Sequence, residues 1–337
     1  MTGSYALYCC AVLSTSSGSL PGILDRDSPI QILHLNVFME QQEFADGLEI
    51  SNEEYCNWRR EHLDSDVSTT PPSSEDLLRT FQYLVGQGYH EAIVTTLSHK
   101  LSDSADMVRQ VAEQVPQLKV HVVDTGTCCM PEGFFALEAD RLLREGKNPT
   151  EIVAYLEKLK ERCNIIFGLT TIKSLVGSGT MARLGASLCD WLGLRAVLRF
   201  SQDQLCRVES TSDDEKMFDA IIDQVLKLMQ GKTREQFILG GLYTGERDRY
   251  RIFAERFFKR TGICLDDGVP VSPVVAVHVG ICGVGVGMVE KLEAAASRSN
   301  TESACIPDAY SGLTLNQYGV ASPCRTICTV CGFVALS

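Results

Sequence analysis

Positive charge is scarce in this chain of 337 residues, which carries 31 Lys and Arg against 43 Asp and Glu and has a formal net charge of −12. The sequence contains no stripe of clustered Lys and Arg. Binding to phosphate backbones depends on clustered Lys and Arg that displace counterions. The sequence therefore argues against a nucleic-acid surface and, for the same reason, against an anionic membrane surface.

Long uninterrupted apolar segments are also lacking. The first apolar stretch, residues 5–13, is short and follows no Lys or Arg, so it fails as a secretory signal and suits a buried strand. Residues 268–289 carry no charge and have about the length of a membrane span, but Pro270, Pro273 and several glycines make a poor apolar helix. We expect a buried strand, a Gly-rich turn and a short helix start there, with no stable membrane insertion.

Cysteine, in contrast, is abundant, and its setting indicates a reducing compartment. Most of the 14 cysteines stand inside apolar runs, as Cys9, Cys10 and Cys163 do. This is typical of reduced core residues in a cytoplasmic protein. The composition, 45% hydrophobic and 22% charged, is that of an ordinary folded chain, and its length favours two domains.

The last 48 residues differ in character, because Ser, Ala, Asn and Gly replace the periodic apolar pattern. Cys324, Cys328 and Cys331 have a spacing that can ligate an iron–sulfur cluster, with Cys305 as a fourth ligand. An incidental tail without metal is the alternative, and we prefer it because no barrel follows the motif. We expect residues 290–337 to be irregular.

Apolar runs alternate with helix-period segments along the rest of the chain, which predicts an α/β fold. Strand-like runs occupy residues 5–13, 30–39, 92–97 and 120–124, separated by helices at 75–88, from Leu101 and at 130–146. A further helix at 149–162 precedes a second α/β region, with strands at 163–171, 194–200, 237–243 and 272–279. We predict an N-terminal parallel-sheet, Rossmann-like domain at 1–162 and a C-terminal α/β domain at 163–289.

Hydroxyl side chains gather where three strands end, at residues 14–21, 67–76 and 92–104. Each run taken alone suits helix N-caps. If the strands are neighbours in one parallel sheet, however, the hydroxyls and the free helix N–H groups share one crevice that can hold an anion. His278, at the end of the apolar run 272–279, is either a satisfied core residue or part of such a site.

At these runs the sequence resembles the DegV family of fatty-acid-binding proteins, in six motifs that occur in the right order. The similar segments are Ser14–Pro21, the strand Leu33–Met39 followed by Ala45–Ile50, Thr69–Ser73, Ser98–Ser104, Val122–Thr125 and Val277–Gly283.

The resemblance implies two α/β domains with a lipid pocket between them and one buried long-chain fatty acid, with no cofactor and no catalytic residue. The carboxylate would be held by hydroxyls and an imidazole: Thr69, Thr70, Ser98, Ser102 and His278. Pocket-lining or supporting roles would fall to Ser16, Asp124 and Gly280. A monomer that presents its fatty acid to an ATP-dependent kinase is the implied partnership.

Four departures from the family pattern qualify that partnership. Thr15 stands where the family has Asp, Asp103 where it has Gly, and Arg195–Ala196 where it has Lys-Pro. The segment Ser178–Met181 lacks the Arg of the family's G-G-R-I loop. The resemblance therefore supports fatty-acid binding more strongly than it supports a partnership with a kinase. A lipid-sequestering regulatory protein without a kinase partner is an alternative.

Two enzyme classes compete with this interpretation. Residues Gly177–Ala182 fit G-x-G-x-x-A, with Asp203 at the distance of a ribose-binding acid, as in an NAD(P)-dependent oxidoreductase. That site requires a strand that ends at Gly177, whereas residues 171–176 favour a short helix or turn. A hydrolase would use Ser98 or Ser102 with His278 and Asp124, but neither serine lies in G-x-S-x-G.

Overall fold

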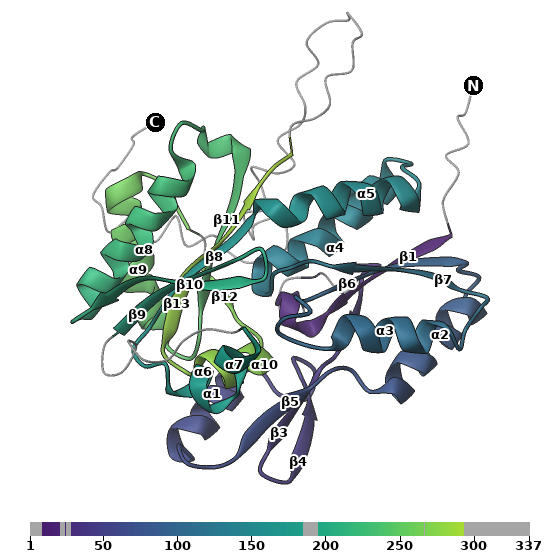
Figure 1. Ribbon diagram of the computed structural model, residues 1–337, viewed down its shortest axis with the longest axis horizontal. Coiled ribbons are helices and arrows are strands. Elements are labelled where there is room, and N and C mark those ends of the chain that lie inside the picture. Colours follow the sequence, from purple (N-terminus) through teal and green to yellow (C-terminus); the bar gives the residue numbers. More distant parts are fainter. Residues whose placement is uncertain (1–8, 21–23, 25–27, 185–194, 266, 293–337) are drawn as a thin grey trace, which may run out of the picture.

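The computed structural model of the chain describes residues 9–20, 24, 28–184, 195–265 and 267–292 (Figure 1). None of the helices in these ranges is long and apolar enough to cross a bilayer. The cysteines at 305, 324, 328 and 331, and with them nearly all of the predicted irregular tail, lie outside the described residues.

The first sheet is parallel, as the alternating pattern predicts. In the described part of the chain it has four strands in the order β2-β1-β6-β7: β2 (Gln31–Leu33), β1 (Cys10–Thr15), β6 (Glu91–Thr96) and β7 (Lys119–Asp124). Figure 1 shows helices on both of its faces: α2 (Ser74–Gly86) and α3 (Ser104–Ala112) on one, α4 (Cys129–Arg144) and α5 (Pro149–Leu159) on the other.

Side chains of this sheet alternate between the two helical layers. Leu13 and Val94 are buried against α2 and α3, whereas Val12 and Ile93 are buried against α4 and α5. A strand covered on both faces reads as a continuous apolar run, which is why the sequence pattern identified these strands.

A separate antiparallel sheet interrupts this domain, and the sequence did not predict it. Within the described residues it has the order β4-β3-β5: β4 (Gln42–Ala45), β3 (Asn36–Met39) and β5 (Val67–Thr70), with α1 (Asn52–Glu61) between β4 and β5. The run 30–39, predicted as one strand, is thus divided between two sheets. The chain turns where the Leu35 N–H donates to the Ser16 hydroxyl at 3.1 Å.

The placement of β5 shows that the three hydroxyl-rich runs do not all follow strands of one parallel sheet. Strands β1 and β6 are indeed neighbours in that sheet, but β5 belongs to the small sheet. The hydroxyls at the start of the run 67–76 therefore belong to the small sheet and not to the parallel sheet. The same run also caps a helix, because Ser73 accepts a hydrogen bond from the Asp76 N–H at 3.0 Å.

The second large sheet is mainly antiparallel. Its order in the described residues is β10-β9-β8-β13-β11-β12, comprising β10 (Gln204–Thr211), β9 (Arg195–Ser201), β8 (Cys163–Leu169), β13 (Gly283–Glu290), β11 (Phe237–Tyr243) and β12 (Val269–Pro270). Among the described strands of this sheet, only β11 and β12 pair in parallel. One face is covered by α8 (Asp214–Met229) and α9 (Arg247–Thr261), which pack on Ile166 and Val197.

The region 268–289 differs from its prediction in two places. Residues 272–279, predicted as a strand, form the helix α10 (Pro273–Val279), and the expected Gly-rich turn is strand β13. A short apolar run does not distinguish strand from helix, and Pro at the first helical position favours the latter. The glycines of β13 permit close packing, since a Cβ on Gly285 would lie 2.5 Å from the Ile166 carbonyl oxygen.

A buried carboxyl group lies where β1 meets α4. Glu132 is fully buried and accepts hydrogen bonds from Ser17 Oγ, at 2.8 and 3.0 Å, and from Thr15 Oγ1. Burial raises the pKa of Glu132 to about 8, more than the two hydroxyls lower it, and the charges of Asp46 and Asp124 add to the rise. Glu132 is therefore largely protonated at neutral pH.

This raised pKa makes the free energy of unfolding fall as the pH rises from about 4.5 to about 8. Unfolded Glu132 loses its proton near pH 4.5 and folded Glu132 near pH 8, so its stabilising effect is lost as the pH rises through about 8. Between pH 6.5 and 8 we expect the free energy of unfolding to fall by up to about 1.4 kcal/mol per pH unit. Glu132→Gln should flatten this slope in urea unfolding, whereas Glu138→Gln on the same helix should keep it. An equal slope in wild type and Glu132→Gln contradicts the assignment.

Candidate functional site: an apolar pocket with a polar end

A cavity of about 410 Å³ lies between the small sheet, the carboxyl end of the parallel sheet and the second large sheet. This volume is within the range of about 300 to 1,000 Å³ found for small-molecule sites. Its lining comes from segments on both sides of residue 162. Most of the wall is apolar, including Leu101, Ile165, Phe167, Phe200, Leu242 and Val277.

His278 is the centre of the polar end of this pocket. Its Nε2 lies 2.9 Å from Thr69 Oγ1, and its Nδ1 lies 2.9 Å from Thr180 Oγ1. Ser178 Oγ extends the chain of hydrogen bonds to Thr180 Oγ1 at 2.9 Å. Thr69 comes from β5, Thr180 from α7 (Thr180–Arg183) and His278 from α10, so three elements far apart in sequence meet at one imidazole.

The helix that carries His278 is fixed at both of its ends. At the N-terminal end, Asp46 Oδ1 accepts the Val274 N–H at 2.9 Å, and the Asn52 amide donates to the Val271 carbonyl at 2.7 Å. Burial raises the pKa of Asp46 to about 6. At the C-terminal end, Gly280 adopts φ +88, a conformation that favours glycine. Helix α10 therefore ends at its C-cap residue Gly280, two residues after His278.

The imidazole of His278 is neutral at physiological pH. Desolvation, followed by the positive charge of Arg183, lowers the pKa of His278 to about 4. A neutral ring donates from one nitrogen and accepts at the other. One of the two threonine hydroxyls therefore accepts from the ring and keeps its own proton, which is available for an anionic ligand.

Arg183 and Asp103 form an ion pair beside this polar end. Arg183 Nη2 lies 2.6 Å from Asp103 Oδ1, and both residues line the pocket. The two side chains are 45% and 69% exposed, so the pair contributes little to stability. It does connect α7 to the segment before α3, on opposite sides of the cavity.

The structure brings together some of the residues proposed for the carboxylate and not others. Thr69, Thr70, Ser102 and His278 line the pocket. Ser98 does not, because its fully buried hydroxyl donates to Asp203 and accepts from the Lys100 N–H at 3.1 Å. The turn after β6 directs Ser98 away from the cavity.

The three residues predicted to support the pocket also lie outside its lining. Ser16 accepts the Leu35 N–H, Asp124 bonds to His99, and Gly280 ends α10. Their contacts stabilise the turns that surround the cavity. Sequence reasoning missed Thr180 and Arg183 as pocket residues, although Thr180 stands in the segment where the family's Arg is absent.

The two rival enzyme sites do not assemble. Strand β8 ends at Leu169, and α6 (Lys173–Gly177) separates it from the G-x-G-x-x-A segment, so no strand leads into Gly177 as a dinucleotide site requires. The hydrolase arrangement fails because both ring nitrogens of His278 are bonded to threonines and Asp124 is bonded to His99.

Comparison with known proteins agrees with this fold. The family model described as "Uncharacterised protein, DegV family" matches residues 10–291. A DegV domain-containing protein of Staphylococcus aureus is 26% identical over 286 residues, covering 83% of this chain and 96% of that protein. One from Listeria monocytogenes is 23% identical over 277 residues, covering 82% and 96%.

Solved structures show the same architecture. A stearic-acid-binding protein from Eubacterium ventriosum superposes with a TM-score of 0.74 at 19% identity, covering 83% of this chain and 98% of that one. A DegV family protein from Thermus thermophilus, described by its fatty acid binding, has a TM-score of 0.72 at 22% identity, covering 84% and 99%. Fold and pocket define a mixed α/β protein with an internal apolar cavity. The chain belongs to the DegV family.

The buried setting of His278 predicts an unusual titration. In ligand-free protein, the side-chain ¹⁵N resonances of His278 should remain those of a neutral ring down to about pH 4, well below the ordinary pKa of 6.5. Arg183→Gln should raise this pKa, because it removes a neighbouring positive charge. Titration of His278 near pH 6.5 in wild type would show that the imidazole is solvated and the polar end open.

Proposed function

We propose that this protein binds one long-chain fatty acid, with the acyl chain in the cavity and the carboxylate at the hydroxyls around His278. The observation that carries the proposal is an apolar cavity whose polar end is a neutral imidazole between two threonines. Relatives of this fold from Eubacterium ventriosum and Ruminococcus gnavus are described with stearic and vaccenic acid.

The energetics of chain burial support this ligand class. Burial of one methylene is worth about 0.8 kcal/mol, so a chain of about sixteen carbons offers on the order of 12 kcal/mol. Association costs of about 4 to 15 kcal/mol oppose it. Chain burial thus provides most of the affinity, and the head group sets the orientation.

The carboxylate is the end of the ligand that needs specific donors, because a desolvated anion without hydrogen bonds is strongly unfavourable. Thr69, Thr70, Ser102 and Thr180 offer hydroxyls, and His278 orients two of them. We assign Ser98 a supporting role behind this group. A negative net charge does not attract the anion from a distance, so these local donors determine how it binds.

A carrier role follows from the chemistry of this donor set. Neutral donors leave a carboxylate more nucleophilic than an arginine clamp does, which suits phosphorylation by a separate ATP-dependent fatty acid kinase. The absence of the family's Arg at Ser178–Met181 favours the alternative, a lipid-sequestering protein without a kinase. Formation of acyl phosphate by a bacterial fatty acid kinase, with the loaded protein as the only lipid source, distinguishes the two.

Native mass spectrometry of protein purified from cells tests the binding proposal directly. We expect a retained mass equal to one fatty acid per chain, and one-to-one rebinding of palmitate or oleate after delipidation. A retained dinucleotide, or no uptake of either acid by folded protein, would refute the proposal.

Removal of one hydroxyl tests the head-group assignment. Thr69→Val preserves the shape of the side chain but removes the bond to His278, and it should weaken fatty-acid binding about tenfold, the equivalent of about 1.4 kcal/mol. Calorimetry with delipidated protein measures this. Thr80→Val, whose hydroxyl bonds to the Asp76 carbonyl in α2, is the matched control and should bind like wild type. Equal affinities of Thr69→Val and wild type would exclude Thr69 from the site.

A further inference from the structure

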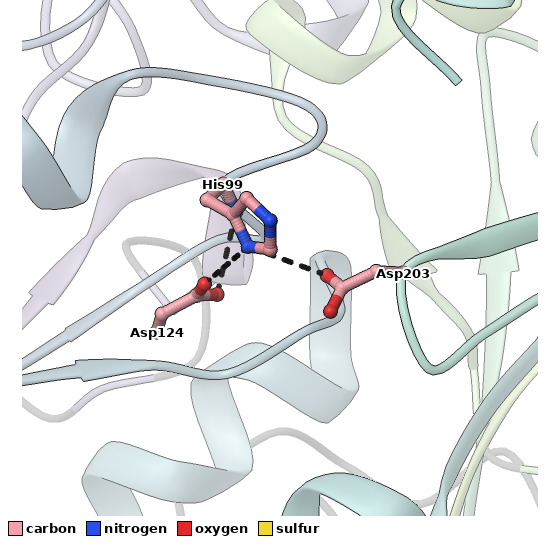
Figure 2. A group of neighbouring side chains, drawn as sticks. All are labelled: His99, Asp124 and Asp203. Carbon is pink, nitrogen blue, oxygen red and sulfur yellow. Dashed lines mark hydrogen bonds and ion pairs between the residues drawn. The ribbon is translucent and has the colours of Figure 1, made fainter. Parts of the chain in front are cut away.

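A second cluster of polar side chains lies on the side of Ser98 that faces away from the pocket. His99 follows β6, Asp124 ends β7, and Asp203 occupies the turn between β9 and β10 (Figure 2). His99 Nδ1 lies 2.6 Å from Asp124 Oδ2 and 3.9 Å from Asp203 Oδ1. One ligand atom from each residue can be chosen so that all three lie within 4.8 Å of one another.

Backbone contacts hold the two carboxylates in this convergent arrangement. Asp124 Oδ1 accepts the Gly126 N–H at 3.0 Å and the His99 N–H at 3.3 Å, which leaves Oδ2 directed at the imidazole. Asp203 accepts the Ser98 hydroxyl, and its own N–H donates to the Gly126 carbonyl at 3.4 Å. The carboxylates are therefore positioned by the two sheets and not by the imidazole alone.

The charge of the cluster is unbalanced. Two carboxylates, with side chains only 12% and 27% exposed, face one imidazole that can supply at most one positive charge. Lys160 is nearby, since its Cε lies 3.6 Å from the position of a Cβ on Gly126, but its ammonium is paired with Glu157 at 3.4 Å. A cation bound between His99, Asp124 and Asp203 would balance this charge.

We propose that His99, Asp124 and Asp203 form a site for a divalent transition-metal ion, of which Mn²⁺ is the representative. One imidazole nitrogen and two carboxylate oxygens are a mixed set of the kind such ions accept, and carboxylate and water ligands suit Mn²⁺ in particular. The His99 side chain is 47% exposed, so water can complete the coordination and the ring can adjust to the distance that the ion requires.

Such an ion would join the two large sheets. Asp124 ends a strand of the parallel sheet, whereas Asp203 belongs to the β9–β10 hairpin of the second sheet. His99, the third residue of the cluster, lies in the segment from Ser98 to Ser102, and Ser102 lines the pocket. The ion would therefore hold one wall of the cavity against the other, a role that does not depend on the identity of the pocket ligand.

Titration with Mn²⁺, followed by the electron paramagnetic resonance signal of the free aquo ion, tests the proposal on the full chain. We choose Mn²⁺ and not Zn²⁺ as the probe because the chain has 14 cysteines, whose thiolates bind softer ions such as Zn²⁺. We expect one ion bound per wild-type chain and a higher melting temperature with Mn²⁺. His99→Gln and Asp203→Asn should each weaken binding at least about tenfold and remove the thermal shift.

Asp248→Asn is the matched control, since Asp248 is 90% exposed and pairs only with Arg251 on its own helix among the contacts described. It should bind Mn²⁺ like wild type. Asp203→Asn also loses the bond to Ser98, so if it fails to fold, the exposed His99→Gln variant decides. No binding by wild type, unchanged binding by His99→Gln, or an equal loss in Asp248→Asn would overturn the proposal.

Discussion

The pair of hydrogen bonds made by His278 is the constraint on which the site depends. Thr69 lies 209 residues from His278 in sequence and Thr180 lies 98 residues from it, yet both hydroxyls reach its ring at 2.9 Å. A buried polar group is stable only when its partners are present. The small sheet, α7 and α10 must therefore all be docked before the imidazole is satisfied. Their docking also closes the apolar cavity, so the polar end and the cavity form together.

Two departures from the family pattern make specific polar contacts in this structure. Thr15 stands where the family's first motif has Asp, and in the structure it donates to the buried carboxyl group of Glu132, which α4 supplies. Asp103 stands where the family has Gly, and it pairs with Arg183, three residues beyond Thr180 in the loop that lacks the family's Arg. The motifs identify these two positions as departures, and the structure shows which contacts the residues found there make.

The sequence predicted the parallel sheet and most helices, because strands such as β6 are buried on both faces and helices such as α8 show a clear apolar stripe. It did not predict the small sheet, since β5 is short and half exposed and reads as the approach to α2. The run 272–279 was misassigned because a short, mostly apolar run fits a strand as well as a helix. Thr69 and His278, which were grouped through family resemblance, are hydrogen-bonded neighbours in the structure. The direction of the Ser98 hydroxyl depends on Asp203 in a distant hairpin, which no local pattern encodes.

A crystal structure of the delipidated protein reloaded with stearic acid tests the account most directly. We expect one acid in the cavity, with its carboxylate within hydrogen-bonding distance of a hydroxyl that is hydrogen-bonded to His278 and its chain against Ile165, Phe167 and Phe200. A ligand bound in the opposite direction, or bound outside the cavity with the contacts of His278 unchanged, would contradict it.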